Sequence, residues 1–147
     1  CMFHSSAKAD SDEKKKDRTR AIKVVKRNAN IFIDEAIPNL FNTNEKPNKQ
    51  AIIKTKKIAL ATSKQGIVAA LEGMRIRLDR EIILKFAPYP ILFIIGKEDN
   101  ILPYKDLVDQ AKLSNNRGYV LLNKVGHMGF FEAKKQCLKI VKKFIRE

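Results

Sequence analysis

The stretch Tyr89–Asp99 reads YPILFIIGKED, and it decides the fold of this chain. Residues 91–95 form an unbroken apolar run, without the alternation of polar and apolar side chains that marks a strand with one solvated face. Such a run is typical of a strand that is buried on both faces of a parallel sheet. Gly96 ends the run, and Asp99 follows in the loop beyond it.

Two further elements come after this strand. Residues 103–113 begin with proline at a plausible first helical turn and carry apolar side chains at helical spacing. Residues 119–122, YVLL, form a second short apolar run. The order strand, helix, strand predicts a right-handed βαβ unit with parallel strands. Asp99 and His127 each follow one of these strands, so we expect both at the sheet edge where ligands and chemistry collect.

Asp99 and His127 are therefore the candidate catalytic residues. A histidine titrates near neutrality and can act as a general base when a partner fixes its tautomer. A carboxylate on the neighbouring loop is such a partner. In a hydrolytic triad the histidine takes a proton from the nucleophile, and the acid stays ionised while it orients the ring.

The segment from Pro90 to the C-terminus resembles the last two strands and the final helix of an α/β-hydrolase. The resemblance rests on a strand-Gly-x-x-Asp pattern that ends at Asp99, followed by Pro103, Gly126, His127, Glu132 and Phe144. It implies a hydrolase of carboxylic esters or related acyl compounds that works by a Ser-Asp-His triad, with Asp99 as the acid and His127 as the base. Glu98 is a competing carboxylate, but the pattern of the family falls on Asp99.

The nucleophile of that family is missing from the sequence. It sits in a Gly-x-Ser-x-Gly elbow between a strand and a helix. The serines of this chain do not lie between two glycines at that spacing: Ser5, Ser6, Ser11, Ser63 and Ser114. Several strands of the family's sheet are missing as well. We therefore expect this chain to be the C-terminal half of a longer enzyme, a fragment that carries only the acid and the base and would be inactive by itself.

The resemblance also suggests how the chain is divided. Residues 1–8 are expected to hold the end of a core strand and a loop, residues 9–87 a helical cap, and residues 88–147 the C-terminal part of the hydrolase core. The fold class is accordingly α/β, a helical cap followed by a β-α-β-α unit of a parallel sheet. Local signals predict five helices in the cap, which begin near Asp10 or Ser11, Ile31, Ala51, Ser63 and Asp79. The last of these is expected to turn Ile82, Ile83 and Phe86 inward.

The chain of 147 residues is strongly basic, with 30 Lys and Arg against 16 Asp and Glu and a net charge of +14. Its lysine clusters, such as residues 14–16 and 142–143, fall on the polar faces of predicted amphipathic helices. They lack an aromatic platform and the spacing of a recognition helix or a zinc finger. This pattern favours a solvated surface over a nucleic-acid site. A catalytically inactive basic helical module that binds nucleic acid or protein stays open as the alternative function.

The remaining expectations are negative or general. The sequence has no apolar run near the roughly 20 residues of a membrane span. Cys1 and Cys137 predict no disulfide framework and fit a reducing compartment, so a cytoplasmic location is the default expectation. The sequence shows no metal-ligand spacing, and we expect no cofactor and a small-molecule substrate as the partner. His4 follows Phe3 without a partner motif, and we predict a structural role for it.

Overall fold

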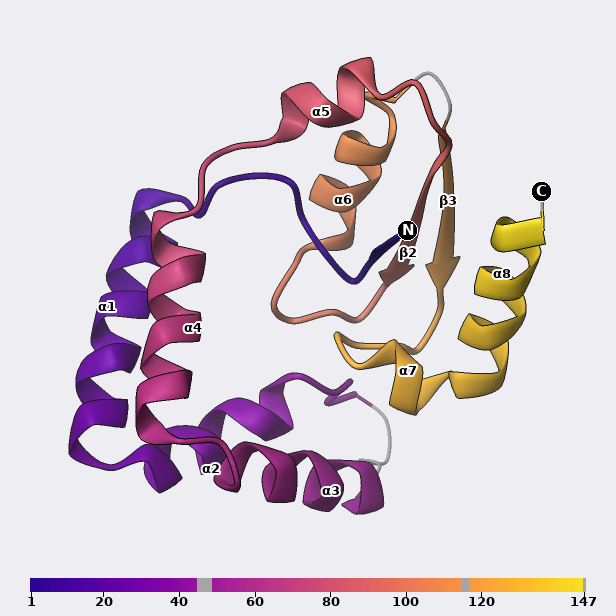
Figure 1. Cartoon of the computed structure of the whole chain (residues 1–147). Helices are drawn as coiled ribbons and strands as arrows, with labels where there is room; N and C mark the ends of the chain where they lie inside the picture. Colours follow the sequence, from indigo (N-terminus) through magenta and orange to yellow (C-terminus); the bar gives the residue numbers. More distant parts are fainter. Residues whose placement is uncertain (45–48, 115–116, 147) are drawn as a thin grey trace. The chain divides into compact units, whose positions relative to one another are not determined.

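A computed structural model of the chain describes residues 1–44, 49–114 and 117–146. The chain divides into two compact units. We call the first the strand unit; it comprises Cys1–Ala7, Asn39–Asn48 and Glu81–Glu147. The second, the helical unit, comprises Lys8–Pro38 and Lys49–Arg80. Figure 1 draws the helices and strands of both units, and each unit is described by itself here.

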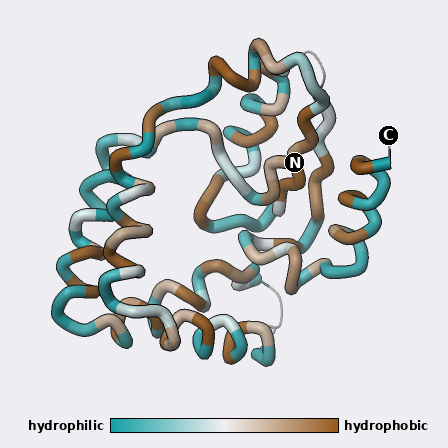
Figure 2. Tube along the Cα trace, in the orientation of Figure 1, coloured by the Kyte–Doolittle hydropathy of each residue, from teal (hydrophilic) through white to brown (hydrophobic). Residues whose placement is uncertain are grey.

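The strand unit is built on a small parallel sheet. Its strands are β1 (Met2–Phe3), β2 (Ile91–Gly96) and β3 (Arg117–Leu122), in the order β1-β2-β3. Phe93 in the central strand is paired with Met2 on one side and with Tyr119 on the other. Every residue of β2 is buried, which explains why its sequence is apolar without alternation. Figure 2 shows the hydrophobic colouring that runs along the strands.

Helices cover both faces of β2. Those that pack on it are α5 (Glu81–Phe86), α6 (Tyr104–Ala111) and α8 (Lys134–Arg146), and the short helix α7 (Gly129–Glu132) comes just before α8. Phe93 and Ile95 pack with Leu84 of α5 and Leu107 of α6 on one face. Leu92 and Ile94 pack with Cys137 of α8 on the other. The predicted order β2, α6, β3 with parallel strands is confirmed, and the sheet is the core from which the loops of the site extend.

The prediction of which residues of the short helix α5 face the core is wrong. Ile82, Ile83 and Phe86 are 59%, 48% and 70% exposed, whereas Leu84 is 4% exposed. A helix of six residues makes fewer than two turns, so few of its side chains can face the core. Leu84 takes that position and packs on the sheet.

The helical unit contains α1 (Asp12–Arg27), α3 (Lys49–Leu60), α4 (Lys64–Ile76) and all but the last residue of α2 (Ala29–Asn39). Helices α1 and α4 share a core of Ile22, Val25 and Leu71. Ser11 caps α1 by accepting a hydrogen bond from the amide of Lys14 at 3.3 Å. The unit is narrower than the expected span 9–87, and its interpretation as a cap stays a prediction.

Asp10, the other candidate for this cap, has a different role. It is 5% exposed, and its carboxylate lies 3.0 Å from Nε of Arg18 and 3.1 Å from Nη2 of Arg77. A buried carboxylate needs such partners to offset its desolvation. The ion pairs join the start of α1 to the segment that follows α4.

The described helices include none that is both long and apolar enough to cross a bilayer.

Candidate functional site

The loop after β2 fixes the carboxylate of Asp99. Oδ1 accepts hydrogen bonds from the amides of Ile101 at 2.8 Å and Leu102 at 3.0 Å, so the side chain closes its own turn. The residue is 8% exposed. This arrangement leaves Oδ2 directed to partners outside the loop.

The loop after β3 brings His127 to that second oxygen. Nδ1 of His127 lies 2.8 Å from Oδ2 of Asp99. An ionised carboxylate only accepts hydrogen bonds, so the proton of the neutral imidazole belongs on Nδ1 and the lone pair on Nε2. The His127 side chain is 24% exposed, while that of Asp99 is fully buried. The imidazole therefore has access to solvent, and the acid behind it does not.

Asp99 stays ionised in this environment. Burial raises the pKa of its carboxyl, but the hydrogen bond from His127, the nearby imidazole of His4 and the amide of Leu102 outweigh burial and hold the pKa well below its usual range. The carboxylate is thus charged at neutral pH and can stabilise a positive charge on the neighbouring imidazole.

Glu132 in α7 holds the His127 loop in place. Its Oε2 accepts hydrogen bonds at 3.1 Å from the amides of Gly126 and Met128, which flank the histidine on both sides. Its Oε1 accepts the amide of Asn42 at 2.7 Å. The amide of His127 itself donates to the carbonyl oxygen of Leu40 at 2.9 Å. The histidine loop is therefore joined to residues 40–42, which lie far away in the sequence.

Of the two adjacent carboxylates, Asp99 contacts His127. Glu98 turns its side chain to Asn44, whose Nδ2 lies 3.4 Å from Oε2. The backbone amide of Glu98 donates to the carbonyl oxygen of Val125 at 2.9 Å, which ties the two loops together. The carboxylate that lies beside the histidine is thus the one on which the pattern of the resembling family falls.

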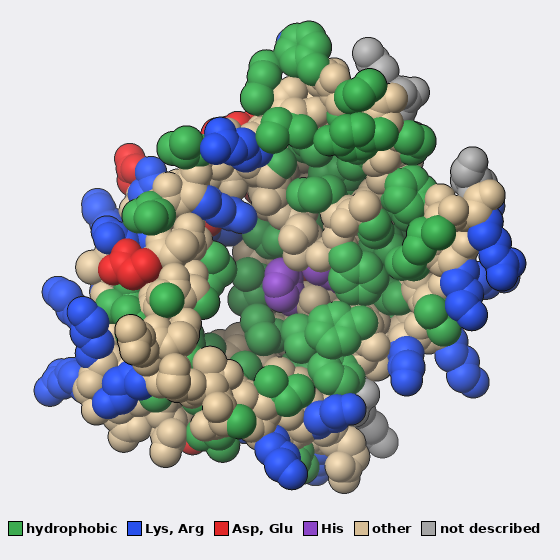
Figure 3. All heavy atoms as spheres, viewed as in Figure 1, with side chains coloured by type: hydrophobic (Ala, Val, Ile, Leu, Met, Phe, Trp, Pro, Cys, Tyr) green, Lys and Arg blue, Asp and Glu red, His purple; other side chains and the backbone are tan. Residues whose placement is uncertain are grey.

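Sequence reasoning missed the proximity of His4 to this pair. His4 follows β1, is 4% exposed, and places its Nδ1 at 3.8 Å from Oδ2 of Asp99. Each of the three described strands is therefore followed by a residue of this cluster: His4 after β1, Asp99 in the loop after β2 and His127 in the loop after β3. The signal in the sequence was the short apolar run before His4: it indicates the end of a strand, so that His4 follows a strand as Asp99 and His127 do. Figure 3 shows the histidine side chains bordered by hydrophobic side chains.

Other cysteine and serine side chains make hydrogen bonds that stabilise the fold. Burial raises the pKa of the Cys137 thiol, and its Sγ donates to the carbonyl oxygen of Gly129 at 3.3 Å, so this cysteine stays protonated. Ser11 and Ser63 cap helices, and the hydroxyl of Ser6 donates to Gln110. The described residues contain no group of three His, Cys, Asp or Glu side chains that could hold a metal ion.

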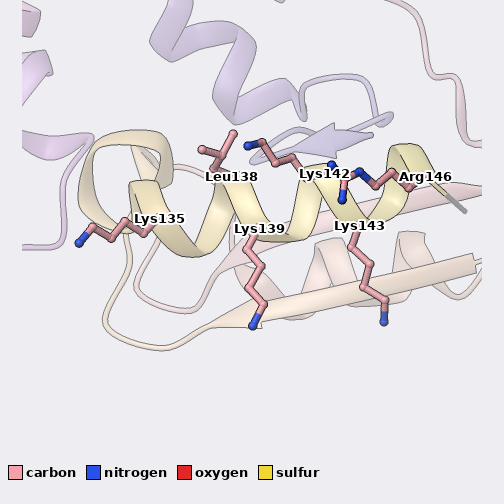
Figure 4. A pocket seen from close by; sticks show the side chains of 6 residues that line it. All are labelled: Lys135, Leu138, Lys139, Lys142, Lys143 and Arg146. Atoms are coloured by element: carbon pink, nitrogen blue, oxygen red, sulfur yellow. The ribbon is translucent and has the colours of Figure 1, made fainter.

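A basic groove lies on α8, apart from the Asp99 and His127 pair. It is lined by Lys135, Leu138, Lys139, Lys142, Lys143 and Arg146. Figure 4 shows these side chains fanning out from the helix, with Lys139 and Lys143 on the side opposite Leu138. The other face of the helix packs Cys137 and Phe144 on the sheet. The lysines do not converge on a common point, as expected for a solvated polar face.

Known proteins match this chain in structure. No protein-family model and no curated protein sequence matches it. A thermophilic esterase from Thermogutta terrifontis is 25% identical with a TM-score of 0.89, over 98% of this chain and 54% of the esterase chain. An enol-lactonase from Burkholderia xenovorans LB400 is 18% identical with a TM-score of 0.86, over 99% of this chain and 55% of its own. MenH from S. aureus is 18% identical with a TM-score of 0.82, over 98% and 57%.

These matches confirm the predicted fold class. The chain has the α/β-hydrolase fold over the part that it spans, with helices followed by a β-α-β-α unit of a parallel sheet. It spans about half the length of the structures that it matches.

Proposed function

We propose that this chain supplies the acid and the base of an ester or acyl hydrolase that works by a Ser-Asp-His triad. The observation that carries the proposal is the 2.8 Å contact between Oδ2 of Asp99 and Nδ1 of His127, made by loops at the carboxyl ends of adjacent parallel strands. The order of acid before histidine is the one that α/β-hydrolases use. The nucleophile would come from a part of the protein outside these 147 residues.

We infer a separate step for each of the two residues. Nε2 of His127 takes the proton from the nucleophile's hydroxyl as its oxygen attacks the acyl carbon, and returns the proton to the leaving alcohol. A water molecule then attacks the acyl-enzyme and loses its proton to Nε2. Nε2 returns this proton to the oxygen of the nucleophile as the carboxylic acid product leaves. Asp99 stays ionised, keeps the ring oriented and stabilises the imidazolium. The depressed pKa of Asp99 supports this role.

The fold and its structural neighbours support the proposed substrate class. The structures that match this chain include an esterase and an enol-lactonase, and a lactone is a cyclic ester. We therefore propose a small-molecule carboxylic ester or related acyl compound as the substrate. We assign no nucleic-acid partner, because the lysine clusters lack an aromatic platform and the spacing of a recognition helix or a zinc finger.

The test uses the protein encoded by the complete reading frame that contains this chain, called the intact protein below. It is assayed against a series of p-nitrophenyl esters of increasing acyl length. The proposal predicts ester turnover that falls by several orders of magnitude in His127→Ala, with circular dichroism unchanged. An intact protein that hydrolyses no ester of the series, or a His127→Ala variant within tenfold of the unaltered protein, would contradict it.

A further inference from the structure

We propose that His4 is a positioning residue that holds the Asp99 carboxylate at Oδ2, the oxygen that also contacts His127. This inference rests on the proposed function, because it gives a second imidazole to the acid of the triad. The His4 side chain is 2% exposed, so it is placed to act on Asp99 rather than on a substrate.

The backbone of His4 is held in an uncommon conformation. Its φ of 41° lies in the left-handed region, which residues other than glycine seldom adopt. Such a conformation costs free energy and persists where the surrounding contacts enforce it. Here the amide of His4 donates to the carbonyl oxygen of Ile94 at 2.9 Å, which continues the pairing of β1 with β2. The turn that ends β1 thus delivers the imidazole beside Asp99.

Gly129 makes room for the imidazole ring, because a Cβ there would overlap Nε2 of His4. A Cβ at Gly96 would lie 3.0 Å from Cε1 of the same ring, and closer still to the carbonyl oxygens of Gly126 and Val125. Phe3 packs on another side, with ring centroids 4.8 Å apart. The ring therefore fills a narrow space at the ends of β1 and β2 that side chains at these two positions would close.

The buried ring of His4 has unused hydrogen-bonding capacity. Among the described residues, neither Nδ1 nor Nε2 of His4 has a hydrogen-bond partner. Leaving such a buried donor unpaired costs about 1–3 kcal/mol. The Asp99 Oδ2 atom lies 3.8 Å from Nδ1, slightly beyond hydrogen-bond distance, and a shift of less than about 1 Å would complete the bond. An apolar ring would fill this space without that cost, so the imidazole points to a role for its N–H group.

The titratable groups around His4 determine which acceptor its N–H group can bond to. The titratable groups that face it are Asp99 at 3.8 Å and His127, whose ring centroid is 6.2 Å away. Glu132 is engaged by the amides of Asn42, Gly126 and Met128, and Cys137 by Gly129. With His4 donating to Oδ2, each carboxylate oxygen of Asp99 would accept two hydrogen bonds. The carboxylate could then not rotate away while His127 carries the transferred proton.

The test compares His4→Phe with His4→Gln in the intact protein. Phenylalanine fills the space without an N–H donor, whereas glutamine keeps a donor but packs less well. We expect His4→Phe to lower kcat tenfold to a hundredfold with KM within threefold and a changed pH profile of kcat, and His4→Gln to recover most of kcat. A purely structural role would instead make kcat follow the thermal stability, with the glutamine variant the worse of the two.

A second readout does not depend on activity. The proton shared by Nδ1 of His127 and Asp99 gives a low-field proton NMR signal, assigned by its loss in Asp99→Asn. We expect His4→Phe to shift or broaden this signal and His4→Gln to restore it. If esters are not hydrolysed but the signal responds to His4→Phe, the proposed function fails and the positioning role stands. If esters are hydrolysed while His4→Phe leaves both kcat and the signal unchanged, the positioning role fails alone.

Discussion

Oδ2 of Asp99 lies 2.8 Å from Nδ1 of His127, while Oδ1 of the same carboxylate accepts two amide hydrogen bonds from its own loop. One oxygen fixes the acid to its own loop, and the other holds the imidazole. Because the two residues come from neighbouring parallel strands, their distance depends on the register of β2 with β3. The predictions below test this cluster and the contacts that support it.

Acid should destabilise the folded protein partly through Asp99. Its pKa is depressed in the folded state, so its stabilising contribution is present above the unfolded pKa of about 3.9 and is lost as pH falls from there towards the folded pKa. We expect the free energy of unfolding, measured with urea, to fall below about pH 4, and to fall less steeply in Asp99→Asn. Equal slopes in the two proteins would show that Asp99 contributes nothing to this loss.

Glu132→Gln should loosen the histidine loop. The glutamine amide group would face backbone donors that now point at a carboxylate oxygen, so at least one of the three amides loses its acceptor. We expect the free energy of unfolding to fall by about 1–3 kcal/mol and kcat to fall with it. The matched control is Glu98→Gln, because the Glu98 side chain accepts one long hydrogen bond from Asn44. Equal stabilities of the two variants would refute the role of Glu132.

Asp10→Ala should destabilise the helical unit. It removes a carboxylate that pairs with both Arg18 and Arg77, and these arginines are partly exposed, so water can solvate them afterwards. We expect a loss of about 1–3 kcal/mol, measured by chemical denaturation. Asp12→Ala is the control: its side chain is 94% exposed and pairs with Lys15 at 3.5 Å, so the expected loss is below about 1 kcal/mol. A control that loses as much as Asp10→Ala would contradict the structure.

Gly73→Ala should stabilise the protein. Gly73 lies inside α4, and a Cβ there would meet no atom within 4 Å. Alanine lowers the entropy of the unfolded chain and favours helix by about 0.5–1 kcal/mol relative to glycine. The melting temperature of the intact protein should therefore rise. A lower melting temperature would mean that another part of the protein packs against this position.

The strand unit could be predicted in large part from local sequence. The unbroken apolar run of β2 indicated burial on both faces, and the residues that follow β2 and β3 gave Asp99 and His127 as neighbours. The sequence left the start of α1 open between Asp10 and Ser11, and Ser11 is the residue that accepts the Lys14 amide. These features succeeded because each depends on a short segment with its own periodicity or turn chemistry.

The rest depends on contacts between distant parts of the chain. Glu132 accepts the amide of Asn42 across 90 positions, and no local pattern indicates that pairing. His4 follows a strand of two residues, which is too short for a periodicity signal, and only the fold brings it close to Asp99. The prediction of the buried face of α5 failed for a similar reason. Contact with the sheet, rather than the spacing of apolar residues in the helix, determines that Leu84 is the buried residue.

The central claim is that Asp99 is the acid that serves His127. The most direct test measures ester turnover of the intact protein with Asp99→Asn and with Glu98→Gln. Asparagine keeps the size of the side chain but removes the charge and the preference for the Nδ1–H tautomer, so we expect kcat to fall by roughly four orders of magnitude. Glu98→Gln should stay within threefold of the unaltered protein. Near-normal turnover in Asp99→Asn, or a larger loss in Glu98→Gln, would contradict the account.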